Sequence, residues 1–333
     1  MLAALAASLA LAATPEEAAV AAALRSAAAG GPRAAAATAP GGPRAAAATA
    51  PLLAAPYLPS ALGEGFGPDP DPRFRLDAFD CMTFVETAVA LGSASTIDEA
   101  RRAMDDVRYS GAPARAARNH EVLSQWIPAN VAKGWIEDAG ARVAGPLVRI
   151  AEKTYTADSW EVVRAAGRAI PGLPRKRLPL GRFAVAVVPA ADVPTVAQRI
   201  PPGAIAFVVR ADAPERATRI THAGIVVSGP GGAVLVRHAT SSKGVGRVIE
   251  EPIERFLRRE ARAWPAWPVE GLAVFTIRDN VEHLRSLEPS LHASPPGGRA
   301  SEGAAVGAPR APRGAPAPRG GGEGSPPPTP ARL

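Results

Sequence analysis

The sequence has a single cysteine, Cys81, among its 333 residues. One thiol can form neither an intramolecular disulfide nor a cysteine-rich metal site. Cys81 is therefore either an inert buried side chain or a reactive nucleophile. We find no set of His and carboxylate residues with metal-ligand spacing, so we expect neither a metal nor another cofactor.

Aromatic residues are also scarce, at 5% of the chain, and the basic residues behind the net charge of +7 are scattered. Nucleic-acid-binding proteins usually gather basic side chains into a stripe with interleaved aromatic residues. We therefore expect no nucleic-acid partner. The charge supports at most a mild attraction to anionic polymers or surfaces, such as a cell wall or membrane.

Long apolar runs are lacking as well. Residues 2–13 are apolar, too few to span a bilayer but about as many as the core of a signal peptide. An Ala-x-Ala pattern at 10–12 fits a cleavage site, whereas the usual positively charged start is missing. Either the true start lies upstream or this is an alanine-rich helix. We expect a signal peptide at 1–13, export to the periplasm or cell envelope, and no transmembrane span.

Alanine, glycine and proline dominate both ends of the chain. The sequence GGPRAAAATAP occurs twice in tandem, at 30–40 and 41–51, and a unit of eleven residues is too short for a solenoid repeat. Its composition is typical of a linker, so we predict a linker over 14–54. The composition after residue 288 predicts a disordered tail, which we place at 281–333. The folded domain is then 55–280, and we expect a monomer.

Within that domain, helical spacing comes before strand-like runs. Apolar spacing predicts helices at 80–91, 98–107, 123–135 and 158–169. Short β-branched runs bounded by Gly or Pro predict strands at 183–188, 204–210, 222–227, 233–238 and 272–277. This order favours an α+β fold with the helices packed on one side of an antiparallel sheet.

Cys81 lies at the start of the first of these helices. Asp80 is a plausible N-cap, which places Cys81 in the first turn. There the helix dipole lowers a thiol pKa, and free backbone N–H groups can hold an oxyanion. A lone cysteine is more often inert, but the capped position favours a nucleophile.

Two of the five histidines lie on one predicted hairpin. His222 opens the strand 222–227 and His238 closes the strand 233–238, with a Gly-rich turn between them. The turn brings the two imidazoles side by side, so that one can face the thiol while the other orients it. This is the arrangement of nucleophile, base and orienting group found in cysteine hydrolases.

These motifs resemble a known family. The segments HAGIVV at 222–227 and RHATSSKGV at 237–245 are similar to the histidine hairpin of NlpC-type cell-wall cysteine hydrolases. The residues after Cys81 are Met-Thr rather than the usual Ser-Gly. The variant DCMTFVE at 80–86 resembles instead the N-acetylmuramoyl-L-alanine amidase-like branch, as do RYSG at 108–111, RNH at 118–120 and Trp126.

The resemblance covers about residues 57–278 and implies a papain-like fold. It implies hydrolysis of the amide between the lactyl group of N-acetylmuramic acid and L-alanine, with peptidoglycan or muropeptide fragments as partner. Cys81 would be the nucleophile, His222 the general base and His238 the group that orients it. The substrate cleft would be lined by Arg108, Tyr109, Arg118, His120 and Trp126, with Trp126 stacking on a sugar ring.

Three alternatives remain open. An endopeptidase of the same superfamily would cut the stem peptide after D-glutamate with the same three residues. A non-catalytic cell-wall binding module would carry a decayed site, which the intact Cys81, His222 and His238 argue against. Acyl transfer would replace water with an amine.

Overall fold

The computed structural model describes residue 18, residues 21–24 and residues 41–287. The predicted signal peptide and the part of the predicted tail after residue 287 lie outside these residues. Across the described ranges, no helix is long and apolar enough to cross a membrane.

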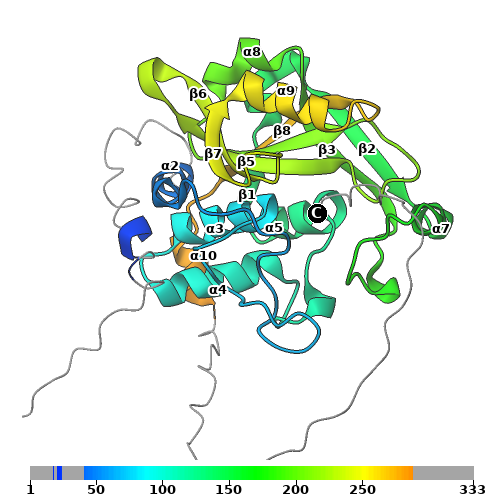
Figure 1. Cartoon of the computed structure of the whole chain (residues 1–333), viewed down its shortest axis with the longest axis horizontal. Coiled ribbons are helices and arrows are strands. Elements are labelled where there is room, and N and C mark those ends of the chain that lie inside the picture. Colours follow the sequence, from blue (N-terminus) through cyan, green and yellow to red (C-terminus); the bar gives the residue numbers. More distant parts are fainter. Residues whose placement is uncertain (1–17, 19–20, 25–40, 288–333) are drawn as a thin grey trace, which may run out of the picture.

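An antiparallel sheet forms the centre of the molecule (Figure 1). Its strand order is β2-β3-β8-β4-β5-β6-β7, and β1 pairs with β8 beside β3. The strands are β1 Ile136–Asp138, β2 Arg149–Tyr155, β3 Gly181–Pro189, β4 Ile205–Arg210, β5 Ile220–Ser228, β6 Val234–Thr240, β7 Arg247–Pro252 and β8 Val269–Ile277. The five predicted strands are all present, and the α+β prediction with an antiparallel sheet is confirmed.

Helices cover both faces of this sheet (Figure 1). On one face lie α2 Gly41–Ala48, α3 Cys81–Ser93, α4 Ile97–Arg108, α5 Ile127–Ala132 and α10 Val281–Ser286. The other face carries α6 Gly140–Ala144, α8 Val193–Val196 and α9 Ile253–Ala263, while α7 Ala157–Ala165 packs with a smaller cluster near β2.

The prediction that the helices lie on one side is therefore wrong. Strand β4 shows why, because all six of its residues are buried. Its side chains alternate between the two apolar clusters, with Phe207 on the α3 side and Val208 on the α9 side. A strand buried on both faces reads as a continuous apolar run, which is the pattern of this segment.

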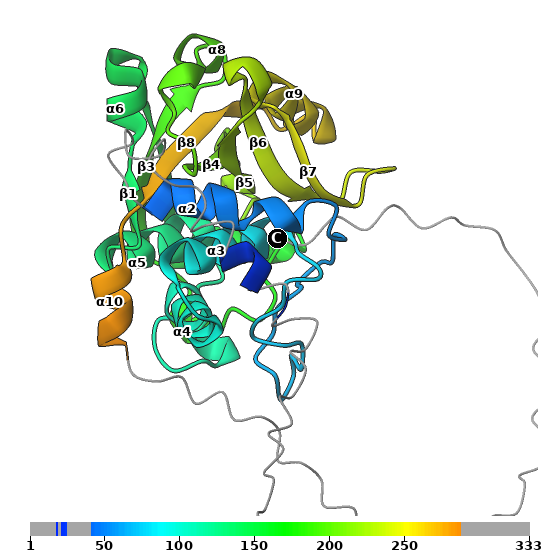
Figure 2. The ribbon, with the colours of Figure 1, turned by 90° about the vertical axis from the view of Figure 1, so that its left-hand side faces the viewer.

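The second copy of the tandem repeat belongs to the folded body. It forms α2, which lies against α3 (Figure 2). Ala45 of α2 packs on Gly92 of α3, and at the start of α2 a Cβ on Gly41 would overlap the carbonyl oxygen of Arg278, just after β8. The predicted linker is therefore wrong from residue 41 onward, and the domain begins earlier than residue 55. Likewise α10 buries Leu284, so the predicted tail does not begin at 281.

We predict that Gly41→Ala lowers the free energy of unfolding by about 1–3 kcal/mol, since the added methyl group has no space. Denaturant unfolding measures this. Gly111→Ala is the matched control, because a Cβ there meets nothing within 4 Å, and it should change stability by less than about 0.5 kcal/mol. Equal effects of the two substitutions would contradict the close packing of α2.

Candidate active site

Helix α3 begins at Cys81 because Asp80 caps it. The Asp80 carboxylate accepts the backbone N–H of Thr83 at 2.7 Å, and the Thr83 hydroxyl accepts the backbone N–H of Asp80 at 2.9 Å. This reciprocal capping box satisfies two groups that a helix end otherwise leaves unpaired. The predicted cap is confirmed, and it fixes Cys81 in the first turn.

The Cys81 side chain is 3% exposed and lines a cavity of about 180 Å³. His222 lines the same cavity, so the structure brings together the two residues predicted as nucleophile and base. The cavity lies where α3 packs against β5. Its other walls come from distant parts of the chain, namely Tyr57, Thr221, Thr240, Ser241, Ser242, Glu260, Ala263 and Trp264.

The surroundings of Cys81 favour the neutral thiol. Burial raises the pKa of Cys81 well above its ordinary value, and the nearby carboxylates of Asp80 and Glu260 raise it further. Backbone N–H groups of Ala223 and Met82 act in the opposite direction but do not offset this. The expectation that the helix start lowers the thiol pKa is therefore not met.

The two predicted histidines lie side by side, as the hairpin requires. His222 Nε2 and His238 Nδ1 are 2.7 Å apart, and β5 pairs with β6 in antiparallel register. Both rings pack against Phe256 of α9, with centroid separations of 5.5 and 4.9 Å. His238 is fully buried, and its Nε2 lies 3.1 Å from Oε1 of Glu251 on β7.

These contacts determine which nitrogen of each ring carries the proton. Burial opposes ionisation of Glu251, but hydrogen bonds from His238 and Arg259 lower its pKa to about 2, so Glu251 is an acceptor. Burial lowers the pKa of His238 to about 4, so its ring is neutral at pH 7. His238 Nε2–H therefore donates to Glu251, and its Nδ1 accepts Nε2–H of His222. The remaining nitrogen of His222, Nδ1, lies outside this chain of hydrogen bonds.

Sequence reasoning missed Glu251 and Glu260. Glu260 lies on the buried face of α9, with Oε1 3.9 Å from His222 Nε2. Buried Arg210 holds this region, since it donates to the Glu260 backbone carbonyl at 2.7 Å. An acidic residue on the apolar face Ile253, Phe256, Leu257 and Glu260 was a detectable signal. Glu251 offered none, because its partners come together only in the fold.

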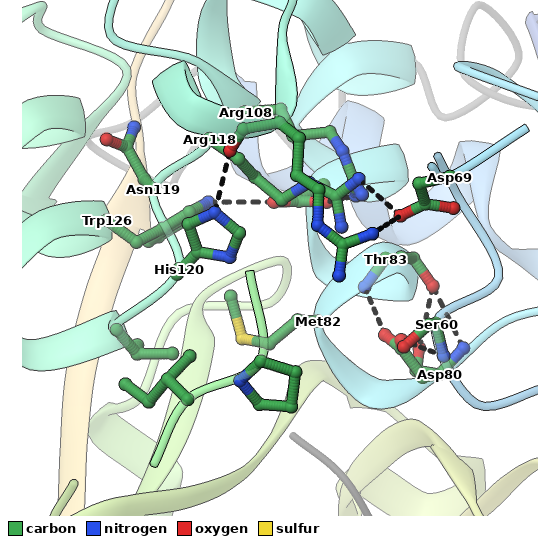
Figure 3. Close-up of a pocket in the computed structure, with 15 residues that line it drawn as sticks. Ser60, Asp69, Asp80, Met82, Thr83, Arg108, Arg118, Asn119, His120 and Trp126 are labelled. Carbon is green, nitrogen blue, oxygen red and sulfur yellow. Dashed lines mark hydrogen bonds and ion pairs between the residues drawn. The ribbon is translucent and has the colours of Figure 1, made fainter. Parts of the chain in front are cut away.

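A second, polar cavity of about 140 Å³ adjoins the start of α3 (Figure 3). Asp80, Met82 and Thr83 line it on either side of Cys81 in the sequence, together with Arg118 and His120. Arg118 is already paired, at 3.0 Å from Glu64 and 2.8 Å from Asp69. His120 donates to the Arg115 carbonyl at 2.8 Å, and burial lowers its pKa to about 4. Arg118 and His120 thus lie where substrate-binding residues were predicted, and that role stays a prediction.

The other three predicted cleft residues are buried. Trp126 is 1% exposed, and its indole N–H donates to Glu86 at 3.1 Å. Arg108 is 4% exposed and donates to the same carboxylate at 2.7 Å, while the Tyr109 hydroxyl bonds to Glu64 at 3.1 Å. Trp126 and Arg108 nevertheless line the same polar cavity as Arg118 and His120, so the stacking of Trp126 on a sugar stays a prediction. Through these contacts Arg108 and Tyr109 also join α4 to the rest of the body, and their predicted role in substrate binding stays a prediction.

Comparison with known proteins finds a matching family and several solved structures of similar fold. A family model described as N-acetylmuramoyl-L-alanine amidase-like matches residues 47–263. A solved structure from Legionella pneumophila has a TM-score of 0.58 at 21% identity, covering 69% of this chain and 86% of that one. An N-acetylmuramoyl-L-alanine amidase from Bacteroides uniformis has a TM-score of 0.52 at 19% identity, covering 68% and 94%. No curated protein matches. At these identities the solved structures show the fold alone.

We predict that alkylation of Cys81 by iodoacetamide accelerates from pH 6 to beyond pH 9 without a plateau, because the thiol pKa is raised. Mass spectrometry of the labelled protein follows the reaction, and the single cysteine makes the signal unambiguous. Free glutathione labelled in parallel is the control for the chemistry of the reagent. A rate that levels off below pH 8 would contradict the prediction, since it would indicate a thiolate already formed.

Proposed function

The chain belongs to the N-acetylmuramoyl-L-alanine amidase-like family, and from this we propose that it is a cysteine-dependent peptidoglycan hydrolase. The scissile bond is the amide between the lactyl group of N-acetylmuramic acid and L-alanine. The papain-like, NlpC-type relationship inferred from the motifs is part of the same proposal, as is export to the cell envelope, where that substrate lies.

One observation carries the proposal. Cys81 at a capped helix start and His222 on β5 line a single cavity, and Nε2 of His222 lies in a chain of hydrogen bonds that runs through His238 to Glu251. A cysteine with an inert role needs neither a base in the same cavity nor a buried chain of hydrogen bonds behind that base. The conjunction supports nucleophilic catalysis.

In the first step, the Cys81 sulfur attacks the lactyl carbonyl carbon while Nδ1 of His222 takes the thiol proton. The negative charge on the carbonyl oxygen is held by backbone N–H groups at the start of α3, including that of Cys81. The imidazolium so formed lies near the Glu260 carboxylate, which opposes a thiolate but favours a positive ring. His222 then gives its proton to the leaving nitrogen of L-alanine, and a thioester remains.

In the second step, His222 takes a proton from water, which attacks the thioester carbonyl. The carbon–sulfur bond breaks, N-acetylmuramic acid leaves with a free carboxylate, and the proton returns to Cys81. Both steps use one base in one tautomer. The orientation of His222 by His238 is therefore needed twice in each turnover.

We predict that the purified protein converts MurNAc-tripeptide to free N-acetylmuramic acid and intact tripeptide, and that Cys81→Ala does not. Mass spectrometry of the products measures this, and thermal unfolding checks that the variant is folded. Release of MurNAc-dipeptide and a free diamino acid would instead establish the endopeptidase. If neither set of products forms, the proposed substrate is wrong.

We further predict that Glu251→Gln lowers kcat by about 10–100-fold, as is usual when a group that orients a catalytic residue is lost. Oε1 of Glu251 contacts both His238 and Arg259 Nε, whereas Oε2 contacts Arg259 Nη2 and Arg255. When the amide oxygen of Gln takes the Oε2 position, its NH₂ takes the Oε1 position, faces His238 and favours the opposite tautomer. The proton of His222 then lies on Nδ1, where it blocks the base.

Glu250→Gln is the matched control, because Glu250 is the adjacent residue of β7 but pairs with Arg237, away from the histidines. It should leave kcat within about twofold. The pH dependence of kcat distinguishes a changed tautomer of His222 from a structural defect, since a purely structural defect lowers kcat equally at every pH. If Glu251→Gln retains full activity while folded, the hydrogen-bonded chain does not set the tautomer.

A further inference from the structure

A cavity of about 460 Å³ opens beside the one that holds Cys81. Ser242 and Ala263 line both cavities, so they share a wall. The remaining residues of the larger cavity are all basic, namely Lys243, Arg255, Arg258, Arg259 and Arg262. We call it the arginine cavity.

The positive charge of the arginine cavity is only partly balanced. Glu251 lies within 3.3 Å of Arg255 and 2.7 Å of Arg259, and it also accepts from His238. Among the described residues, Arg258, Arg262 and Lys243 form no ion pair. Grouping several cations around a hollow costs electrostatic free energy in the unliganded protein, and an anionic ligand recovers it.

Helix α9 fixes this charge relative to the reacting groups. On its buried side Phe256 packs 5.5 Å from the His222 ring, and Glu260 lines the Cys81 cavity. Its arginines line the other side of the same helix. A ligand bound there is therefore held at a fixed offset from His222, by one rigid element rather than by a loop.

The arginine cavity and the polar cavity at the start of α3 differ in charge. In the polar cavity of Figure 3, Arg108 and Arg118 are paired with Glu86, Glu64 and Asp69. That cavity therefore offers hydrogen-bonding groups but little uncompensated charge. The arginine cavity offers uncompensated charge, and suits carboxylates, which guanidinium groups bind through paired hydrogen bonds.

We propose that the arginine cavity binds the carboxylates of the stem peptide, the leaving half of the substrate. This rests on the proposed function. The sugar half is neutral, because its lactyl carboxyl is part of the scissile amide, whereas the peptide carries free carboxylates beyond L-alanine. The substrate then lies with its sugar toward the polar cavity, its scissile carbonyl at Cys81, and its peptide along α9.

The test measures binding to the intact chain carrying Cys81→Ala, so that no turnover occurs. Isothermal titration calorimetry compares MurNAc-tripeptide with MurNAc-L-alaninamide, which has no carboxylate. Adding Arg258→Gln and Arg262→Gln should raise the Kd for MurNAc-tripeptide about tenfold or more, with no such loss for the alaninamide. Raising the salt concentration should likewise weaken only the tripeptide complex.

Arg149→Gln with Arg199→Gln is the control pair, since it removes the same charge from exposed positions outside the cavity. It should leave both Kd values unchanged. Equal weakening of both ligands by the cavity variants, no weakening of either, or failure of MurNAc-tripeptide to bind would each overturn the proposal. Hydrolysis by the unmodified enzyme is followed in parallel. Selective binding without hydrolysis would sink the proposed function but leave carboxylate binding standing.

Discussion

The site depends on the contacts of one buried carboxylate, that of Glu251. Burying a charge is costly unless partners replace the lost water. Here Arg259 donates to both oxygens at 2.7 and 2.9 Å, and His238 lies 3.1 Å away. The same carboxylate therefore joins β7 to α9, fixes the histidine tautomers and neutralises part of the arginine cavity. Because each of these three roles needs the negative charge, we expect Glu251 to tolerate little change.

The electrostatics around Cys81 favour the protonated thiol. Asp80 is needed to begin the helix, and Glu260 favours a charged imidazole, but both disfavour a nearby thiolate. A thiol held in this way reacts slowly with stray electrophiles and oxidants. In the mechanism that we propose, the proton transfer to His222 and the attack on the carbonyl then belong to one step, as in the serine hydrolases, and no ion pair forms beforehand.

The sequence was informative where local patterns decide structure. The cap at Asp80 and the apolar spacing after it located α3, and the strand pattern around the Gly-rich turn located the hairpin that joins His222 to His238. Patterns within one element could not reveal partners from another. Glu251 resembles any strand-end acid until Arg259 and His238 surround it. Nor could composition show that Trp126 is only 1% exposed, or that its indole N–H is bonded to Glu86.

The contacts of helix α2, which comes from the tandem repeat, likewise could not be seen in its own sequence. The two copies of GGPRAAAATAP are identical in sequence, and the second begins α2 with two glycines at a close contact. A Cβ on Gly41 would overlap the carbonyl oxygen of Arg278, and the carbonyl oxygen of Gly42 leaves no space for a Cβ on Gly203. For this contact the copies are interchangeable in sequence. A recombination event that removes one of them leaves a complete helix-forming segment behind.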